Sequence, residues 1–165
     1  MTTREWNKAP LFVAVLAMAF AFFSTAASAA GNDRQAVLAA NAQFYAALNR
    51  MFVGEIAPME TVWSHADDVT YMGPGGQFEH GWNTALKTWQ DQAAMKLGGR
   101  VEPAEMQLIV GRDVAVVTDF EVGENTNAAG KVAQVKLRAT NTFRKEGGHW
   151  KMVGHHTDLL PYLAK

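Results

Sequence analysis

The end of the chain, His155-His156-Thr157-Asp158, concentrates side chains that transfer protons. Imidazole titrates near neutral pH, and an aspartate that orients a histidine is the arrangement used in general-base catalysis. Side chains alternate between the two faces of a strand, so His156 and Asp158 share one face. That face also carries Trp150 and Met152, which favour burial. We therefore predict that His156 points inward with Asp158 as its partner, although a single β-bulge would place His155 there instead.

Two histidines and a carboxylate are also ligands of metal ions. Adjacent histidines on a strand point to opposite faces, so a metal ion would need further ligands, for example His65 or His80. The chain has no cysteine, which excludes thiolate metal sites and disulfides. We predict no metal ion and no cofactor.

A second group of titratable residues is His65-Ala66-Asp67-Asp68. Two carboxylates beside an imidazole can act as an acid and a base. The same residues are common where a helix ends and a turn leads into a strand, because Asp side chains bond to nearby backbone N–H groups. We favour the turn and keep His65 as a candidate for the wall of a pocket.

The glycine-rich stretch at 73–76 lies between a β-prone segment and a helical one. A phosphate-binding loop has a lysine and a hydroxyl residue at the start of the helix, where this chain has Trp82 and Asn83. Pro74 also lacks a backbone N–H group. We interpret the stretch as a sharp turn at the rim of a cavity.

Large aromatic residues can form either a core or the wall of an apolar pocket, and in a cone-shaped domain the two overlap. Asn141 lies in a row that is otherwise apolar, so it needs a buried partner or a ligand. Arg138 lies in the opposite row, and the pattern leaves open which row faces the pocket. The predicted ligand pocket consists of Phe44, Tyr71, Trp82, Trp89, Asn141 and His65.

Hydrophobic periodicity predicts the elements that position these residues. Apolar residues recur every three or four positions in 32–52, 58–64 and 82–97, which indicates three helices. They alternate in 106–110, 114–122, 131–145 and 149–157, which indicates strands, and a further short strand is predicted at 69–72. This order indicates an α+β fold, in which three helices of the N-terminal half pack on a strongly curved antiparallel sheet. The resulting cone-shaped domain encloses a pocket.

Three strings of residues, taken in order, resemble the SnoaL-like group of the nuclear transport factor 2-like superfamily. They are VWSHADDVTYMGPGGQFEHGW at 62–82, RATN at 138–141 and FRKEGGHWKMVGHHTD at 143–158. The resemblance implies a cone-shaped α+β fold, a pocket between helices and sheet, and frequent homodimers through the outer face of the sheet. It implies no single function, because the superfamily contains isomerases, dehydratases, polyketide cyclases, transport adaptors and association domains.

The ketosteroid isomerase branch of that superfamily resembles this chain along YAALN at 45–49 and ADDVT at 66–70. The alignment places Phe44 and Gly73 where that branch has an oxyanion-hole tyrosine and a catalytic aspartate. Phenylalanine cannot donate a hydrogen bond to an oxyanion and glycine cannot abstract a proton. The mechanism of that branch is therefore not expected here.

The first thirty residues have the layout of a secretory signal peptide. Arg4 and Lys8 precede an apolar run at 11–23, and small residues follow up to Ala30. The apolar run has 13 residues, whereas a helix needs about 20 to span a bilayer. We predict cleavage after Ala29, which gives a signal peptide at 1–29 and one SnoaL-like domain at 30–165. The mature domain is expected to be periplasmic or secreted and free of the membrane.

The function that we favour from the sequence is binding of a small, mostly apolar molecule between helices and sheet. One alternative is an enzyme of the isomerase, dehydratase or cyclase kind that uses His156 with Asp158, with His65 or Tyr71 as further candidates. Another is an association module whose function is the homodimer itself. The formal net charge of −1 and the absence of a basic run argue against nucleic acid as a partner.

We expect the exported protein to begin at Ala30 or Gly31, because the small residues at 27 and 29 satisfy the cleavage rule. Intact-mass measurement on protein recovered from the periplasm or the medium checks this. A mass that includes residues 1–29 would contradict the predicted export.

Overall fold

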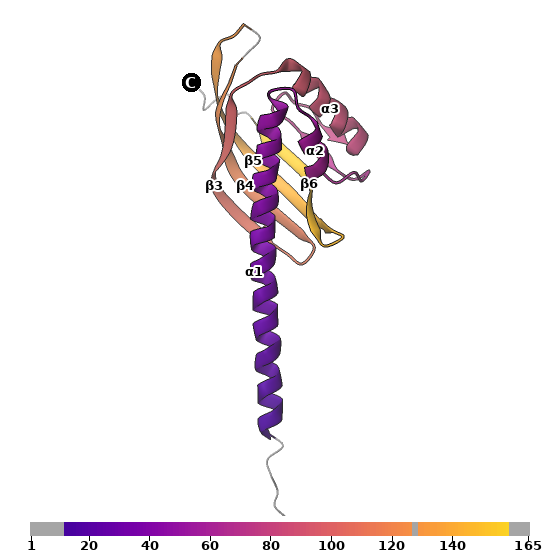
Figure 1. The fold of residues 1–165 in the computed structure, drawn as a ribbon, viewed down its shortest axis with the longest axis vertical. Helices are drawn as coiled ribbons and strands as arrows, with labels where there is room; N and C mark the ends of the chain where they lie inside the picture. Colours follow the sequence, from indigo (N-terminus) through magenta and orange to yellow (C-terminus); the bar gives the residue numbers. More distant parts are fainter. Residues whose placement is uncertain (1–11, 127–128, 159–165) are drawn as a thin grey trace, which may run out of the picture. The chain divides into compact units, whose positions relative to one another are not determined.

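The computed structural model describes the backbone of residues 12–126 and 129–158 and the side chains of residues 31–126 and 129–158. The chain divides into two units, 1–33 and 34–165, and the second carries the sheet (Figure 1). The predicted signal peptide lies outside the part whose side chains are described, so cleavage after Ala29 stays a prediction. Among the described residues, no helix is long and apolar enough to cross a membrane.

The described part of the chain contains three helices, as the periodicity predicts. They are α1 (Phe12–Met51), α2 (Ala57–Val62) and α3 (Trp82–Met95). α1 begins before the predicted residue 32, because the preceding residues are rich in Ala, Leu, Met and Phe and include no proline after residue 10. The apolar stripe predicted for this helix is buried, including Val37, Phe44, Leu48 and Met51.

Within residues 12–126 and 129–158, the strands form one open sheet of six strands in the order β2-β1-β6-β5-β4-β3. Their bounds are β1 (Thr70–Met72), β2 (Glu79–His80), β3 (Arg100–Val110), β4 (Val114–Thr126), β5 (Val132–Glu146) and β6 (His149–Asp158). β3 to β6 are antiparallel neighbours, but β1 pairs with β6 in parallel. The sheet is therefore mixed and not purely antiparallel as predicted, since alternation identifies strands but not the direction in which they pair.

Helices pack on one face of the sheet, so the domain has an α+β architecture (Figure 1). The core between the two layers contains many aromatic rings. The largest fully buried side chains are Trp63, Trp89, Tyr71, Phe44 and Phe143. On β5 the alternation predicted from the sequence is confirmed: Leu137, Ala139, Asn141 and Phe143 are buried, whereas Lys136 and Arg138 are exposed on the outer face.

β6 contains a β-bulge that decides which of its residues face the core. Phe143 pairs with Met152 and Thr142 pairs with Gly154, so β6 has one extra residue, Val153, between these pairs. Alternation before the bulge buries Trp150 and Met152, and alternation after it buries His155 and Thr157. The bulge therefore shifts by one residue the alternation that decides which side chains at the end of β6 face the core.

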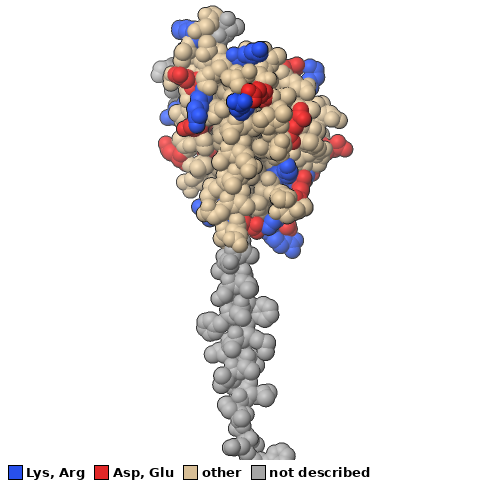
Figure 2. Space-filling view, viewed as in Figure 1, with Lys and Arg blue, Asp and Glu red and all other residues tan. Residues whose placement is uncertain are grey.

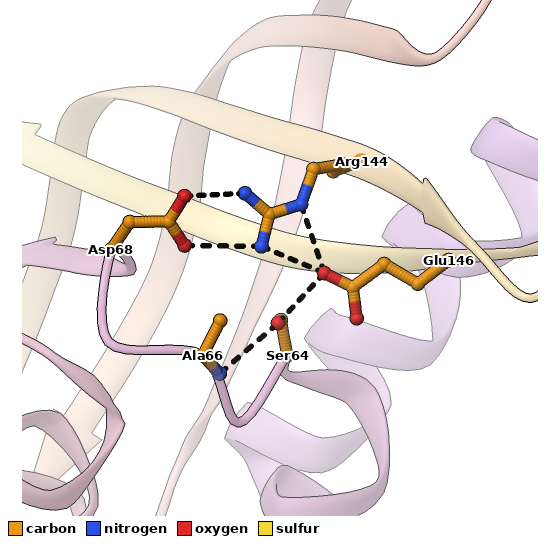
Figure 3. A network of polar contacts seen from close by, with 5 residues as sticks. All are labelled: Ser64, Ala66, Asp68, Arg144 and Glu146. Atoms are coloured by element: carbon orange, nitrogen blue, oxygen red, sulfur yellow. Dashed lines mark hydrogen bonds and ion pairs between the residues drawn. The ribbon is translucent and has the colours of Figure 1, made fainter.

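A network of polar side chains attaches the segment between α2 and β1 to the end of β5 (Figure 3). Arg144 donates two hydrogen bonds to the carboxylate of Asp68, at 2.6 and 3.0 Å, and one to Glu146 at 2.9 Å. Ser64 donates to the same Glu146 carboxylate and accepts from the backbone N–H of Ala66. Asp68 thus has a structural role, as the turn interpretation of residues 65–68 predicts.

The glycine-rich stretch forms the turn between β1 and β2, and Pro74 lies in the wall of a cavity. A Cβ atom on Gly73 would lie 2.3 Å from the hydroxyl of Tyr71, so glycine lets this hydroxyl approach the backbone. On the face shown in Figure 2, basic and acidic side chains are interspersed without an extended patch of one sign.

Candidate functional site

A cavity of about 390 Å³ lies between the helices and the inner face of the sheet, with Gln134 and Lys136 at its exposed end. This volume is within the range of small-molecule pockets. Much of its wall is apolar. The lining residues are Leu48, Phe52, Tyr71, Pro74, Trp89, Gln92, Leu97, Val101, Glu121, Asn125, Gln134, Val135, Lys136, Leu137, His155 and Thr157.

The structure brings only some of the predicted pocket residues to this cavity. Tyr71 and Trp89 line it directly. Phe44 is fully buried and is not part of the cavity wall, but its ring centroid lies 4.7 Å from that of His155, which is. Trp82 and His65 are absent from the cavity wall. Their rings stack on each other, with centroids 4.5 Å apart, and the ring of Trp82 also lies near that of Trp63, next to the end of α2.

The prediction that His156 faces the interior is wrong. His155 is buried and His156 is exposed, because the bulge at Val153 shifts the alternation by one residue. His156 and Asp158 do share a face, as predicted, but it is the outer face of the sheet and not the interior. Asp158 is held on the outer face by two hydrogen bonds from Arg138, which lower the pKa of its carboxyl.

His155 is fixed by a buried hydrogen bond to the residue opposite it on β5. Its Nδ1 atom lies 2.6 Å from Oδ1 of Asn141. The amide nitrogen of Asn141 donates to Oδ1 of Asn41 on α1 at 2.9 Å. Asn141 is fully buried, so the expectation that it needs a buried partner is confirmed. Its partners come from α1 and β6, and it therefore links three elements.

Two acidic residues of β4 face the same interior. Asp119 accepts a hydrogen bond of 2.8 Å from the hydroxyl of Tyr45. Glu121 lines the cavity, is 4% exposed, and has one oxygen 3.6 Å from Nε2 of His155. That oxygen has no hydrogen-bond partner among the described residues. A buried carboxyl group in this position is uncommon and points to a role beyond packing.

Burial changes the protonation of these groups. Burial, together with the nearby charge of Asp119, raises the pKa of Glu121 to about 8, against a hydrogen bond from Tyr45. Burial also raises the pKa of Asp119 to about 6, against the hydrogen bonds from Tyr45 and Asn41. The pKa of His155 falls to about 3, mainly through burial and also through repulsion from His156. At neutral pH the cavity therefore presents a protonated carboxyl group beside a neutral imidazole.

Of this pair, Glu121 is the group suited to proton transfer. Its carboxyl group, with a pKa of about 8, can donate a proton or, once ionised, take one, whereas the neutral imidazole accepts a hydrogen bond, and both reach the cavity. Environments that shift such groups are typical of functional sites. Among the described residues, no group of three His, Cys, Asp or Glu side chains is arranged to hold a metal ion.

A second hollow, of about 530 Å³, lies on the outer face of the sheet. His156, Arg138 and Asp158 line it. Arg138 and Asp158 bond to each other, and all of these side chains are partly or fully open to solvent. The inner cavity is the better candidate site, because its polar groups Glu121, His155 and Thr157 are buried, and Glu121 and Thr157 each have an atom without a partner.

Sequence reasoning missed Glu121, Asp119, Tyr45 and Thr157, although His155 was retained as an alternative. A signal for the acidic pair exists in the sequence. Asp119 and Glu121 share a row of β4 with Ala115 and Val117, and both of these small apolar residues are buried. Hydrophobicity alone favours burial of the other row, which contains Val116 and Phe120. The burial of the acidic row can therefore be inferred only once the pairing of β4 with β5 is known.

Comparisons with known proteins agree on the architecture. The sequence profile of the SnoaL-like domain matches residues 37–160. A proposed dehydratase of the nuclear transport factor 2-like family from Streptomyces avermitilis is 24% identical, with a TM-score of 0.70, over 79% of this chain and 98% of that one. A proposed calcium/calmodulin-dependent protein kinase type II association domain from Thiobacillus denitrificans is 24% identical, with a TM-score of 0.60, over 74% and 93%.

A proposed ketosteroid isomerase from Shewanella frigidimarina is also similar, with 21% identity and a TM-score of 0.58 over 72% of this chain and 90% of that one. No curated protein matches the chain. At these identities the similar structures show the fold and not the activity. The residues of the cavity must therefore carry any functional argument.

The buried carboxyl group of Glu121 predicts a fall in stability as the pH rises. The folded-state pKa of about 8 exceeds the value of about 4.3 expected in the unfolded chain, so the folded protein holds an extra proton between these values. The unfolded-state titration of His155, centred near pH 6.5, acts in the opposite direction but contributes only about 0.4 kcal/mol over this interval. We therefore expect the free energy of unfolding to fall by about 1–2 kcal/mol between pH 6.5 and 8.

Urea denaturation at several pH values checks this prediction. Glu121→Gln should remove most of the pH dependence, whereas Glu124→Gln, on the exposed face of the same strand, should preserve it. A wild-type stability that stays level or increases over this interval would show that Glu121 is ionised in the folded protein.

Proposed function

Because the chain belongs to the SnoaL-like domain family, whose members share a fold but not an activity, we propose a function from its cavity: binding of a small, mostly apolar molecule. The apolar and aromatic side chains of the wall, such as Trp89, Leu97 and Leu137, suit the body of such a molecule. The buried polar residues at the inner end of the cavity, Glu121, His155 and Thr157, suit one polar group on the bound molecule.

The observation that carries this proposal is the unpartnered oxygen of Glu121 at the wall of an open space. Leaving a buried polar atom without a partner costs about 1–3 kcal/mol. A packed core without a ligand would be more stable with an apolar residue at this position. A ligand that bonds to Glu121 accounts for both the cavity and the buried carboxyl group.

An enzyme that uses Glu121 and His155 is a second candidate function. The specific observation in its favour is the separation of 3.6 Å between the carboxyl oxygen and Nε2 of His155. One group can take a proton from a bound molecule while the other returns it at a different atom, as isomerisation or dehydration requires. Phe44 and Gly73 stand where the isomerase branch has its functional groups, so this chemistry would use a different set of residues.

We also propose a homodimer through the outer face of the sheet. Apolar side chains are exposed there on β3 and β4, and Phe120 lies half-buried among them. The most exposed of these residues are Ile109, Val114 and Val122. Exposed apolar patches of this kind are typical of protein interfaces, and the similar association domain from Thiobacillus denitrificans supports a role in oligomerisation. Export through the predicted signal peptide remains part of the proposal.

Filling the cavity should abolish ligand binding without unfolding the protein. We expect Val135→Trp, in the cavity wall, to weaken binding of the neutral fluorophore N-phenyl-1-naphthylamine at least tenfold. Val132→Trp makes the same change on the same strand at a residue that is 51% exposed and absent from the wall, and it should bind like the wild type. Fluorescence titration measures both, with circular dichroism to confirm the fold. Equal binding by the two variants would reject the cavity as the binding site.

A charge on the outer face of the sheet should dissociate the dimer. The wild-type protein is expected to be dimeric at tens of micromolar, which corresponds to an association free energy of about −7 kcal/mol. Phe120→Arg should produce a monomer, because it places like charges from two copies against each other. Val53→Arg, at an exposed residue outside the sheet, is the matched control and should stay dimeric. Light scattering that finds a wild-type monomer at this concentration would reject the proposed interface.

A further inference from the structure

The inner end of the cavity carries more hydrogen-bond acceptors than donors. Among the described residues, the cavity-lining side chains with unpartnered buried atoms are Glu121, Thr157 and Trp89. The Glu121 carboxyl group is protonated in the empty cavity at neutral pH and becomes an acceptor only when that proton leaves, and a threonine hydroxyl can accept as well as donate. Trp89 contributes a group that can only donate. A molecule that brings N–H groups of its own can therefore bond to the inner end by displacing the proton of Glu121.

His155 adds a further acceptor, because the buried amide chain fixes its tautomer. The amide nitrogen of Asn41 faces the sulfur of Met106 at 3.5 Å and also bonds to the carboxylate of Asp119, and both of these groups accept hydrogen bonds. Asn41 must therefore accept through its oxygen from the amide nitrogen of Asn141. The oxygen of Asn141 is then left to accept from Nδ1–H of His155, so Nε2 of His155 carries a lone pair toward the cavity.

The titratable groups around Glu121 are either negative or uncharged at neutral pH. On β4 it is accompanied by Asp119, while α1 contributes Tyr45, β1 contributes Tyr71 and β6 contributes His155. None of these groups is cationic at neutral pH. Lys136 is the one Lys or Arg in the described cavity wall, and it is exposed, with Nζ 5.4 Å from the ring of Phe120. The inner end is therefore a site that a positive charge would stabilise.

Aromatic rings border the same space. Tyr71 and Trp89 line the cavity, with ring centroids 4.2 Å apart, and the ring of Tyr71 is parallel to that of His155. The faces of such rings attract cations. A cation with an apolar body fits this combination of carboxyl groups, acceptors and ring faces better than a neutral polar molecule does.

From this geometry we propose that the cavity binds an apolar primary amine, with its ammonium group against Glu121, His155 and Thr157. This inference rests on the proposed ligand-binding function and names the chemical class of the ligand. The three N–H groups of the ammonium donate to the carboxylate of Glu121, to Nε2 of His155 and to the hydroxyl of Thr157. The apolar body then lies along Trp89 and Leu137.

The proposal requires one proton to move, and this gives binding a characteristic pH dependence. Glu121 holds a proton in the empty protein below pH 8 or so, and that proton is released to solvent when the ammonium binds. Affinity should therefore rise about tenfold per pH unit up to pH 8, because one proton is released per ligand. It should fall only above about pH 10, where an alkyl amine loses its own proton. A neutral ligand that accepts from the Glu121 carboxyl group would instead lose affinity above pH 8.

Titration calorimetry with 2-phenylethylamine and 2-phenylethanol tests the proposal, since the two probes share an apolar body and differ in the polar group. We expect the affinity of the full-length protein for the amine to increase about fiftyfold from pH 6 to pH 8, because Glu121 is half ionised at pH 8, with release of one proton at pH 6. The affinity for the alcohol should not increase. Glu121→Gln should remove the increase, and Thr157→Val should weaken amine binding, whereas Glu124→Gln should leave both unchanged.

Equal affinity for the two probes with the same pH profile would overturn the amine assignment and leave the proposed binding function standing. Failure of both probes to bind would also overturn it. In that case the N-phenyl-1-naphthylamine titration of Val135→Trp and Val132→Trp decides separately whether the cavity binds ligands at all. The comparison of the two probes needs only the wild-type protein, so it does not depend on the folding of any variant.

Discussion

The side-chain amide of Asn141 is the contact on which the interior of the domain depends. It bonds to α1 through Asn41 and to β6 through His155, so a single fully buried group fixes helix, central strand and histidine together. An unpaired amide in this position would cost about 1–3 kcal/mol, which makes the orientation of each partner strongly preferred. The tautomer of His155, and with it the polarity of the cavity, follows from this one arrangement.

The bulge in β6 gives that amide a histidine to bond. In a regular strand without the extra residue Val153, Thr142 and Asn141 would each pair with the residue one position earlier on β6. The alternation that buries Met152 would then leave His155 facing solvent. A bulge is a local change in backbone that re-aims every side chain beyond it. In this domain the bulge makes the C-terminal half of β6 part of the wall of a cavity. The N-terminal half stays in the core, where Met152 pairs with Trp63 and Phe143.

The architecture was predictable from the sequence because it depends on periodicity. The three helices, the long strands and the buried row of β5 are confirmed, and the family profile agrees. The parallel pairing of β1 with β6 and the inward position of His155 on β6 were not predictable. A pattern of period two indicates neither the direction in which strands pair nor the position of a bulge. Among the predicted pocket residues, Tyr71 and Trp89 line the cavity, whereas Trp82 and His65 stack on each other away from it. Glu121 was missed because acidic residues are assigned to the surface by default.

β4 places its more apolar row outside and its acidic row inside, and this has a consequence for how the chain finds its structure. Val116 and Phe120 lie on the outer face, whereas Asp119 and Glu121 are buried. A slip of β4 by one residue would exchange the two rows and bury more apolar surface, so the local preference of this strand opposes its native register. The domain is thus locally frustrated at β4, and the pairing with β3 and β5 must form early enough to select the correct register.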